Sequence, residues 1–263
     1  MPPASKPTWL LILFWMLGSL AMATLGYAVL RAVFGPDFTA SGFGLSATIG
    51  LTSGSAVLVG MMFASQEGWS RADLFPVGSS RGGAAVAAIV GAYPLGILGD
   101  GLSRLVQALL EDVWDAAPPA ANIDLIVSTL TEGPLIERAV FALMVALVGP
   151  VLEELIFRGF LWRAVDGDRR PLRAVALTSV LFALFHGEIS QGVGTLPLGA
   201  FLGLLRWRTG SLRLCFAAHC VNNTAAVVLV TAGAWGTSAS NWELALSALV
   251  GLGAFAWVTR RVR

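Results

Sequence analysis

The feature that most constrains this chain is a succession of long apolar segments separated by short polar connections. A helix that crosses a bilayer needs about 20 mostly apolar residues, and eight stretches approach that length. They are residues 9–30, 42–65, 83–103, 139–162, 172–189, 192–205, 213–233 and 242–259. The sequence therefore predicts an all-α, polytopic membrane helical bundle of about eight transmembrane helices, in a single domain over residues 1–263.

The composition argues against a water-soluble globule. Hydrophobic residues make up 56% of the chain and charged residues only 13%, whereas soluble domains average about 25% charged residues. So few charges cannot cover a globule in water, and the expected surroundings are a lipid bilayer. No basic patch with interleaved aromatic residues is present, which argues against nucleic acid as a partner.

Charge differs from one connection to the next, and this predicts the orientation. Connections after the fourth and sixth segments and the end of the chain are rich in arginine, at Arg163, Arg169, Arg170, Arg173, Arg206, Arg208, Arg213, Arg260, Arg261 and Arg263. Residues 111–132 carry five acids and no Arg or Lys. Because cytoplasmic loops are enriched in Lys and Arg, we expect both termini in the cytoplasm and 111–132 outside, as a loop with a surface-lying turn or helix.

We expect a multi-pass protein of the cell membrane, located in a bacterial inner membrane. Residues 6–23 also have features of a secretory signal peptide, although their apolar run is long for one. Whether this segment is cleaved stays open.

Ionisable and amide side chains cluster in three of the apolar segments. Charged groups at bilayer depth are costly, rare and by default mark functional sites. The segments read GPVLEELIFRGFLW, FALFH and AAHCVNN, and their polar residues are Glu153, Glu154, Arg158, His186, His219, Asn222 and Asn223. They include the only two histidines of the chain. Histidines of this kind also serve as plain interhelical hydrogen-bond partners, so a structural role is the alternative for each.

Helical spacing predicts that the two glutamates point in different directions and have different roles. Residues four apart share a helix face, whereas neighbours point about 100° apart. Glu154 and Arg158 are therefore expected to form an i,i+4 ion pair. Glu153 points elsewhere and has no local partner, which favours a functional role.

The same spacing groups the remaining polar residues. His219 and Asn223 share a face, so that one helix presents an imidazole and an amide together. Phe182 lies one turn before His186 and can pack against its ring. At 1.5 Å per residue, Glu153 lies about 15 Å from the Arg-rich connection that follows it. We therefore expect the group to meet in the cytoplasmic half of the bilayer, with water entering from that side.

This set of residues suits hydrolysis. A carboxylate can act as general base on a water together with an imidazole, and a second imidazole and an amide can donate hydrogen bonds to an oxyanion. Two histidines and one glutamate can instead hold zinc and leave a position for water, and the spacing does not choose between the two. An ion- or proton-coupled transporter would also use such residues, but the chain lacks the paired interrupted helices of inverted-repeat transporters.

Three motifs in order carry a resemblance to a known family. EELIFR fits EExxxR, FALFH fits FxxxH and HCVNN fits HxxxN, over about residues 139–230. The chain resembles the CPBP family of intramembrane proteases, which includes the CAAX prenyl endopeptidases and bacterial homologues tied to bacteriocin processing or immunity. The first three helices contribute nothing specific to the resemblance.

The resemblance implies an intramembrane endopeptidase that cuts near the cytoplasmic membrane face, with residues 139–233 as its catalytic core. Its partner would be a peptide or protein substrate, including membrane-anchored ones. A non-catalytic bacteriocin-immunity protein is the alternative, against which the intact motifs argue.

The resemblance also assigns roles. Glu153 would activate the water with His186, and His219 and Asn223 would line the oxyanion site. Supporting positions would be Glu154, Arg158 and Phe182. The family has been called metalloprotease, and a metal-independent glutamate mechanism has also been argued for it. We favour no cofactor, because Asn223 suits an oxyanion donor better than a zinc ligand; a zinc ion would be held by Glu153, His186 and His219.

Overall fold

The structure is a computed structural model that describes residues 8–78, 82–113, 121–234 and 241–260. Every regular element in these ranges is a helix, which confirms the predicted all-α class. In chain order they are α1 (Thr8–Phe34), α2 (Pro36–Ala40), α3 (Gly42–Gln66), α4 (Arg71–Leu74), α5 (Gly82–Val113), α6 (Ala121–Glu132), α7 (Leu135–Leu143), η1 (Met144–Val148), α8 (Gly149–Glu154), η2 (Leu155–Leu161), α9 (Trp162–Ala164), α10 (Pro171–Phe185), α11 (Ile189–Thr209), α12 (Leu212–Thr231) and α13 (Asn241–Arg260).

The bundle has the surface of a membrane protein. Four of its described helical segments are long and apolar enough to cross a bilayer: Trp9–Phe34, Gly42–Gln66, Leu135–Ala164 and Leu212–Thr231. Large apolar side chains are exposed on them, such as Leu20 and Leu25 of α1, at 64% and 68%. Exposed apolar surface of this extent suits lipid rather than water. These four agree with the first, second, fourth and seventh predicted spans, and the count of eight stays a prediction.

Residues 135–164 form one composite helix, in which two π-helical segments interrupt the α-helical path. In η1 the amide of Gly149 donates to the carbonyl of Met144, five residues back. Such π-turns are rare and are found frequently at functional sites. Between η1 and η2 lies the short α8, which carries both glutamates of the EExxxR motif.

The fifth and sixth predicted spans form an antiparallel hairpin, and neither is among the four described segments that are long and apolar enough to cross a bilayer. α10 has 15 residues, about 22 Å at 1.5 Å per residue, which is shorter than the roughly 30 Å hydrocarbon core. His186 caps its end, and α11 begins at Ile189 and runs back. Gly192, Gly199 and Gly203 let the two helices pack closely, because a Cβ at any of them would press on α10.

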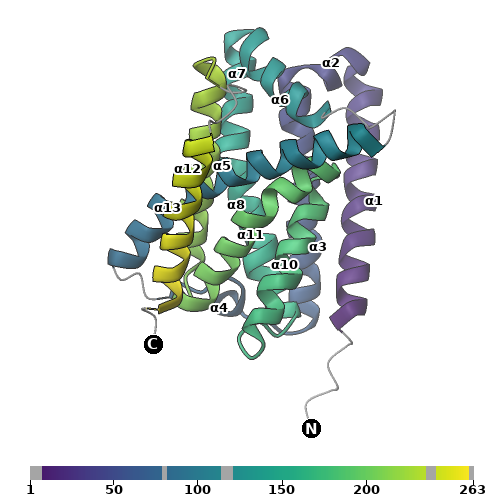
Figure 1. The fold of residues 1–263 in the computed structure, drawn as a ribbon. Coiled ribbons are helices and arrows are strands. Elements are labelled where there is room, and N and C mark those ends of the chain that lie inside the picture. Colours follow the sequence, from purple (N-terminus) through teal and green to yellow (C-terminus); the bar gives the residue numbers. More distant parts are fainter. Residues whose placement is uncertain (1–7, 79–81, 114–120, 235–240, 261–263) are drawn as a thin grey trace.

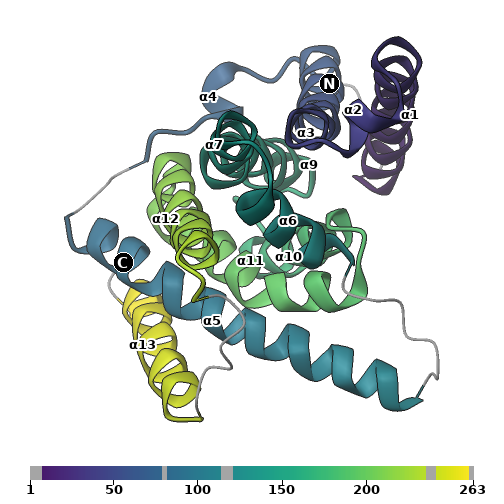
Figure 2. The same ribbon diagram turned by 90° about the horizontal axis from the view of Figure 1, so that it is seen from above.

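Two packed regions surround the hairpin. On one side α5 runs obliquely along α11, as Figures 1 and 2 show, and the two helices share a core with α12. On the other side an aromatic cluster joins α1, α3, η2 and α10, with Trp15, Phe157, Phe160 and Phe182 at its centre. The Nε1–H of Trp15 donates to the carbonyl of Ala56 at 2.9 Å, which fixes α1 on α3.

The two ends of the bundle differ in charge. Figure 1 shows α4 and the α9–α10 turn at one end, and α2, α6 and the start of α7 at the other. We call the first the Arg-rich end; its described arginines include Arg71, Arg163, Arg169, Arg170, Arg173, Arg208 and Arg213. The second, the Arg-poor end, carries the acids Asp37, Glu111, Asp112, Asp124 and Glu132. Within 111–132, residues 111–113 end α5, residues 114–120 lie outside the described residues, and Ala121–Glu132 form α6; the external position of this segment stays a prediction.

Candidate active site

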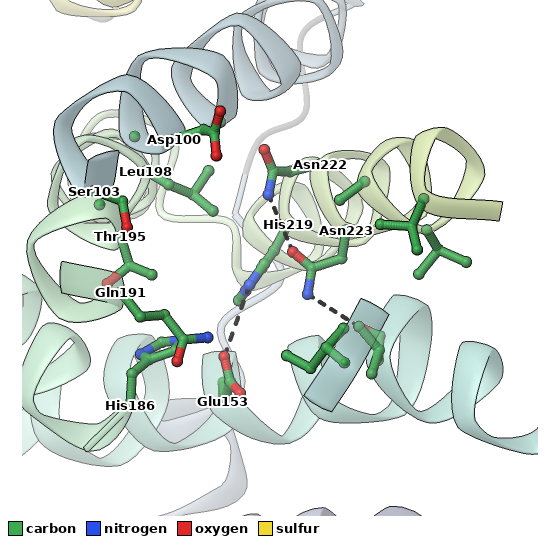
Figure 3. A pocket seen from close by; sticks show the side chains of 18 of the residues that line it. Asp100, Ser103, Glu153, His186, Gln191, Thr195, Leu198, His219, Asn222 and Asn223 are labelled. Carbon is green, nitrogen blue, oxygen red and sulfur yellow. Dashed lines mark hydrogen bonds and ion pairs between the residues drawn. The ribbon is translucent and has the colours of Figure 1, made fainter. Parts of the chain in front are cut away.

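The four side chains predicted to be catalytic line one cavity of about 220 Å³. Glu153 comes from α8, His186 from the end of α10, and His219 and Asn223 from successive turns of α12 (Figure 3). Spacing within single helices indicated only which residues share a face. The structure adds that three helices bring these faces to the same space.

Glu154 and Arg158 form the expected ion pair, and it is fully buried. Arg158 Nη1 lies 2.9 Å from Glu154 Oε1, and both side chains are 0% exposed. Arg158 Nη2 also donates to the carbonyl of Gly199 on α11 at 2.7 Å. Removing two charges from water is costly, and only mutual pairing and further hydrogen bonds offset that cost. The pair therefore depends on the complete packing of η2 against α11.

The same Glu154 oxygen contacts the histidine of α12. His219 Nδ1 lies 2.9 Å from Glu154 Oε1, and His219 is 2% exposed. A carboxylate that is paired with a guanidinium accepts hydrogen bonds, so Nδ1 is the donor. This contact fixes the imidazole with Nε2 turned the other way, as a buried carboxylate orients the histidine of a catalytic triad. Spacing assigned Glu154 to Arg158 alone and missed this contact, which spans 65 residues.

Glu153 lies at the free side of that imidazole. His219 Nε2 is 3.7 Å from Glu153 Oε2 (Figure 3), and the glutamate side chain keeps 16% of its surface exposed. The two neighbouring carboxylates thus flank one histidine from opposite nitrogens. Glu154 is enclosed by protein, whereas Glu153 faces the cavity.

His186 is oriented in a similar way by backbone. Its Nδ1 lies 2.8 Å from the carbonyl oxygen of Phe182, and because a carbonyl only accepts, Nδ1 carries the proton and Nε2 does not when the ring is neutral. Phe182 packs edge-on against His186, as the spacing predicted, with ring centroids 4.9 Å apart. The same phenyl ring is 5.6 Å from that of His219 and 5.0 Å from the Arg158 guanidinium carbon.

The amides of α12 form a small network at the cavity wall. Asn223 Nδ2 donates to the carbonyl of Val145 in η1 at 3.0 Å, and Asn222 Nδ2 donates to Asn223 Oδ1 at 3.1 Å (Figure 3). An amide nitrogen has two N–H groups, so Asn223 keeps a second one. Asn222 lies against Gly96 of α5, where any Cβ would overlap its side-chain oxygen.

Several cavity residues were missed by sequence reasoning. Asp100 and Ser103 come from α5, and Gln191 and Thr195 from α11. Asp100 is an ionisable residue inside a predicted apolar span, and the rule that drew attention to Glu153 applies to it as well. Gln191 gave no such signal, because only the α10–α11 hairpin brings it beside His186.

A second cavity of about 290 Å³ meets the first at the catalytic residues. Both are lined by Glu153, His186, Gln191 and Asn223, and α6 contributes Ile126 to both. The second extends toward α3, along Leu45, Thr48 and Ile49, whereas the first extends between α5 and α12. The site therefore lies where the two cavities, called the two lobes below, meet.

Water entry from the Arg-rich end was expected, and the cavities lie elsewhere. On the composite helix the residue nearest that end among those lining either cavity is Glu153. Toward the Arg-rich end the helix continues into Phe157, Phe160 and Leu161, which are 4% exposed or less. Aromatic side chains therefore pack this helix on the Arg-rich side of Glu153, and water entry from that end stays a prediction.

The described residues contain no group of three or more His, Cys, Asp or Glu side chains arranged to hold a metal ion. The zinc set considered from sequence, Glu153, His186 and His219, is therefore not assembled as a ligand set. Each imidazole donates its Nδ1–H, to Glu154 and to the Phe182 carbonyl, as metal-bound histidines also do. We derive no step through a metal ion.

Comparison with known families gives a match over part of the chain. Residues 135–225 match the family described as type II CAAX prenyl endopeptidase Rce1-like. These residues run from the start of α7 into α12 and include all three motifs. No curated protein and no protein of solved structure shows a significant match to the chain.

Proposed function

We propose that this membrane protein, whose residues 135–225 match the Rce1-like CAAX endopeptidase family, is a protease. It hydrolyses a peptide bond within the bilayer. The observation that carries the proposal is the pairing of the cavity-facing Glu153 with His219 Nε2 at 3.7 Å. A carboxylate that faces a partly open cavity, next to an oriented imidazole, is what activation of a water requires. Residues 139–233 are the proposed catalytic core.

In the first step Glu153 removes a proton from a water, whose oxygen attacks the carbonyl carbon of the peptide bond. The carbonyl π electrons move to the oxygen, which becomes an oxyanion. His186 lines both lobes beside Glu153 and assists the base through its Nε2. The proton taken up by Glu153 then passes to the amine as the carbon–nitrogen bond breaks.

The oxyanion is stabilised by His219 and Asn223. Asn223 offers the Nδ2 hydrogen that Val145 does not use. Nε2 of His219 lies on the side of Glu153 while Nδ1 is held by Glu154, and Nε2 donates to the oxyanion when both ring nitrogens carry a proton. Donors fixed by such contacts need no reorganisation during the reaction, and they are most effective where water is excluded. Glu154, Arg158 and Phe182 act by positioning His219 and His186.

The test is cleavage by purified protein reconstituted in lipid. Glu153→Gln keeps the shape of the side chain and removes the base, so cleavage should fall by at least about 10²-fold; His186→Ala should also lose cleavage, and both variants should stay folded. Glu132→Gln, an exposed acid on α6, is the matched control and should cleave as the wild type does.

Substrates can be found by comparing the peptides that accumulate in membranes with wild type and with Glu153→Gln. Full cleavage by both active-site variants would refute the proposal. A transport activity that Glu153→Gln abolishes, without any difference in peptides, would favour an ion- or proton-coupled transporter instead.

A further inference from the structure

The first π-turn of the composite helix redirects one backbone hydrogen bond beside the site. In an α-helix the carbonyl of Val145 would accept from the amide of Gly149, four residues on. In η1 that amide donates to the carbonyl of Met144 instead. The residue five positions after Val145 is Pro150, which has no amide hydrogen to donate. The register of η1 and the proline together make the Val145 carbonyl available to a neighbouring helix.

The neighbouring helix that uses this carbonyl is α12. Asn223 Nδ2 donates to the Val145 carbonyl oxygen at 3.0 Å, and both residues line both cavities. A backbone carbonyl without a donor is costly inside a bilayer, and proline is tolerated in membrane helices where a neighbouring helix supplies the missing donor. The contact therefore stabilises the composite helix and holds the amide of Asn223 at the same time.

The second π-turn repeats this arrangement away from the cavities. In η2 the amide of Trp162 donates to the carbonyls of Phe157 and Gly159. Its acceptor in an α-helix would be the carbonyl of Arg158, four residues back. That carbonyl accepts from Nε of Arg206 on α11 at 3.1 Å. In both π-turns, the carbonyl that loses its α-helical donor binds a side chain from α11 or α12.

Asn222 contacts the other end of the same amide. Its Nδ2 donates to Asn223 Oδ1 at 3.1 Å (Figure 3). An amide side chain has a donor end and an acceptor end, which exchange places when the group turns over. The Val145 carbonyl requires the donor end, and the Nδ2 of Asn222 requires the acceptor end. The two contacts thus select the same orientation of Asn223.

The orientation of Asn223 decides what it presents to a substrate. With Nδ2 held at the Val145 carbonyl, the second N–H of that nitrogen is the group available to an oxyanion. The inverted amide would offer an oxygen there, which repels negative charge. Donors of this kind are effective when they are oriented before the reaction begins. Val145 and Glu153 belong to one composite helix, so the anchor of the donor and the proposed base are carried together.

We infer that Pro150, the Val145 carbonyl and Asn222 are positioning elements of the site, which fix the amide of Asn223 with one N–H free for the oxyanion. They act through Asn223 and do not take part in proton or bond transfer. The catalytic consequence rests on the proposed function, whereas the anchoring of Asn223 does not.

A stability measurement tests the anchor without any need for cleavage. Asn223→Ala removes the donor of the Val145 carbonyl, so the denaturant midpoint in detergent micelles should fall. Pro150→Ala supplies an amide hydrogen five residues from that carbonyl, which can take the place of Asn223. In the Pro150→Ala background, Asn223→Ala should therefore lower the midpoint by clearly less. Equal falls in the two backgrounds would overturn the inference, because they would show that the two residues do not share an acceptor.

Pro171→Ala is the matched control for the proline replacement. Pro171 is the first residue of α10, where an amide hydrogen has no acceptor within the helix in any case. Asn223→Ala should lower the midpoint as much in this background as in the wild type. A smaller fall here too would mean that any proline replacement weakens the effect, which would overturn the stated role of Pro150.

Kinetics test the positioning role. Pro150→Ala and Asn222→Ala should each lower kcat by about 10-fold with KM unchanged, which is less than the 10²–10³-fold cost of removing an oxyanion donor outright. In the Asn223→Ala background neither should lower kcat further, because the residue through which they act is gone. A purely structural role would lower kcat by the same factor in both backgrounds. Thr224→Ala, an exposed neighbour on α12, should have the kcat of the wild type.

The two measurements separate the inference from the proposed function. A wild-type protein that cleaves no peptide but shows the smaller midpoint fall with Pro150→Ala would refute the proposed function and support the anchor. Cleavage by the wild type with an unchanged kcat in Asn222→Ala and Pro150→Ala would refute the positioning role and leave the proposed function in place.

Discussion

The composite helix is densely packed on one side of Glu153 and borders cavities on the other. Toward the Arg-rich end every position from Glu154 to Leu161 except Leu155 is buried, in contact with α1, α3, α10 and α11. Toward the Arg-poor end the same helix borders two cavities. The half toward the Arg-rich end, called the buried half, holds Glu154 in place and through it His219. The half that borders the cavities, called the hollow half, leaves Glu153 accessible. Adjacent glutamates therefore have different tasks because the packing around them differs.

The largest effect on stability is expected from breaking the buried ion pair. Arg158→Leu leaves the Glu154 charge enclosed and unpaired, which should lower the free energy of unfolding by about 3–5 kcal/mol. Denaturant unfolding in detergent micelles measures it. Arg104→Leu removes the partner of Asp100 from an i,i+4 pair that is 42% exposed on the arginine side, and should cost about 0.3–0.5 kcal/mol. Equal losses in the two variants would contradict the contrast between the halves.

A smaller effect, on activity rather than stability, is expected from filling the hollow half. Val227→Phe places a ring in the lobe between α5 and α12, where the substrate would lose the burial of one apolar side chain, worth about 1.5–3 kcal/mol. That corresponds to a fall of about 10- to 150-fold in kcat/KM. Val228→Phe changes the adjacent residue, which is 56% exposed, and should have the activity of the wild type. If Val227→Phe also cleaved normally, the lobe would not hold substrate.

The smallest effect concerns the walls of the hollow half, which we expect to be rigid. Gly99 of α5 lies against the backbone of Gly194 on α11, and a Cβ there would overlap the Gly194 carbonyl oxygen. Gly99→Ala should therefore cost about 1–3 kcal/mol of stability through overpacking. Gly54→Ala has no atom within 4 Å of the new Cβ, and should be neutral or stabilising because alanine is the better helix former. A neutral Gly99→Ala would indicate that α5 can move away from the hairpin.

Much of the site could be predicted from sequence because its first contacts are local. The pairs Glu154–Arg158 and Phe182–His186 lie four residues apart in single helices, where a fixed rise and rotation determine which side chains meet. The contact between His219 and Glu154 spans two helices and depends on how α12 crosses α8. No periodicity encodes that crossing, and for the same reason Gln191 was not recognised, whereas Asp100 carried the signal of an ionisable residue in an apolar span.

The two predicted spans at 172–189 and 192–205 illustrate the same limit. Their apolar composition was read correctly, but α10 ends at Phe185 and the chain turns back at once. Hydropathy records which residues avoid water and does not distinguish a helix that crosses the membrane from one that turns back inside a bundle. The tip of that hairpin carries His186 into the site.

By itself the sequence determined an all-α membrane protein, the Arg-rich and Arg-poor ends, and the three motifs that lie within the residues matching the Rce1-like family. These follow from composition and from the repeat of a single helix. Only the tertiary structure decided that both glutamates approach one histidine and that two lobes meet at Glu153. The physical reason is that cavities and interhelical contacts arise from the packing of side chains of different sizes between helices, and these were fixed only when the helices came together.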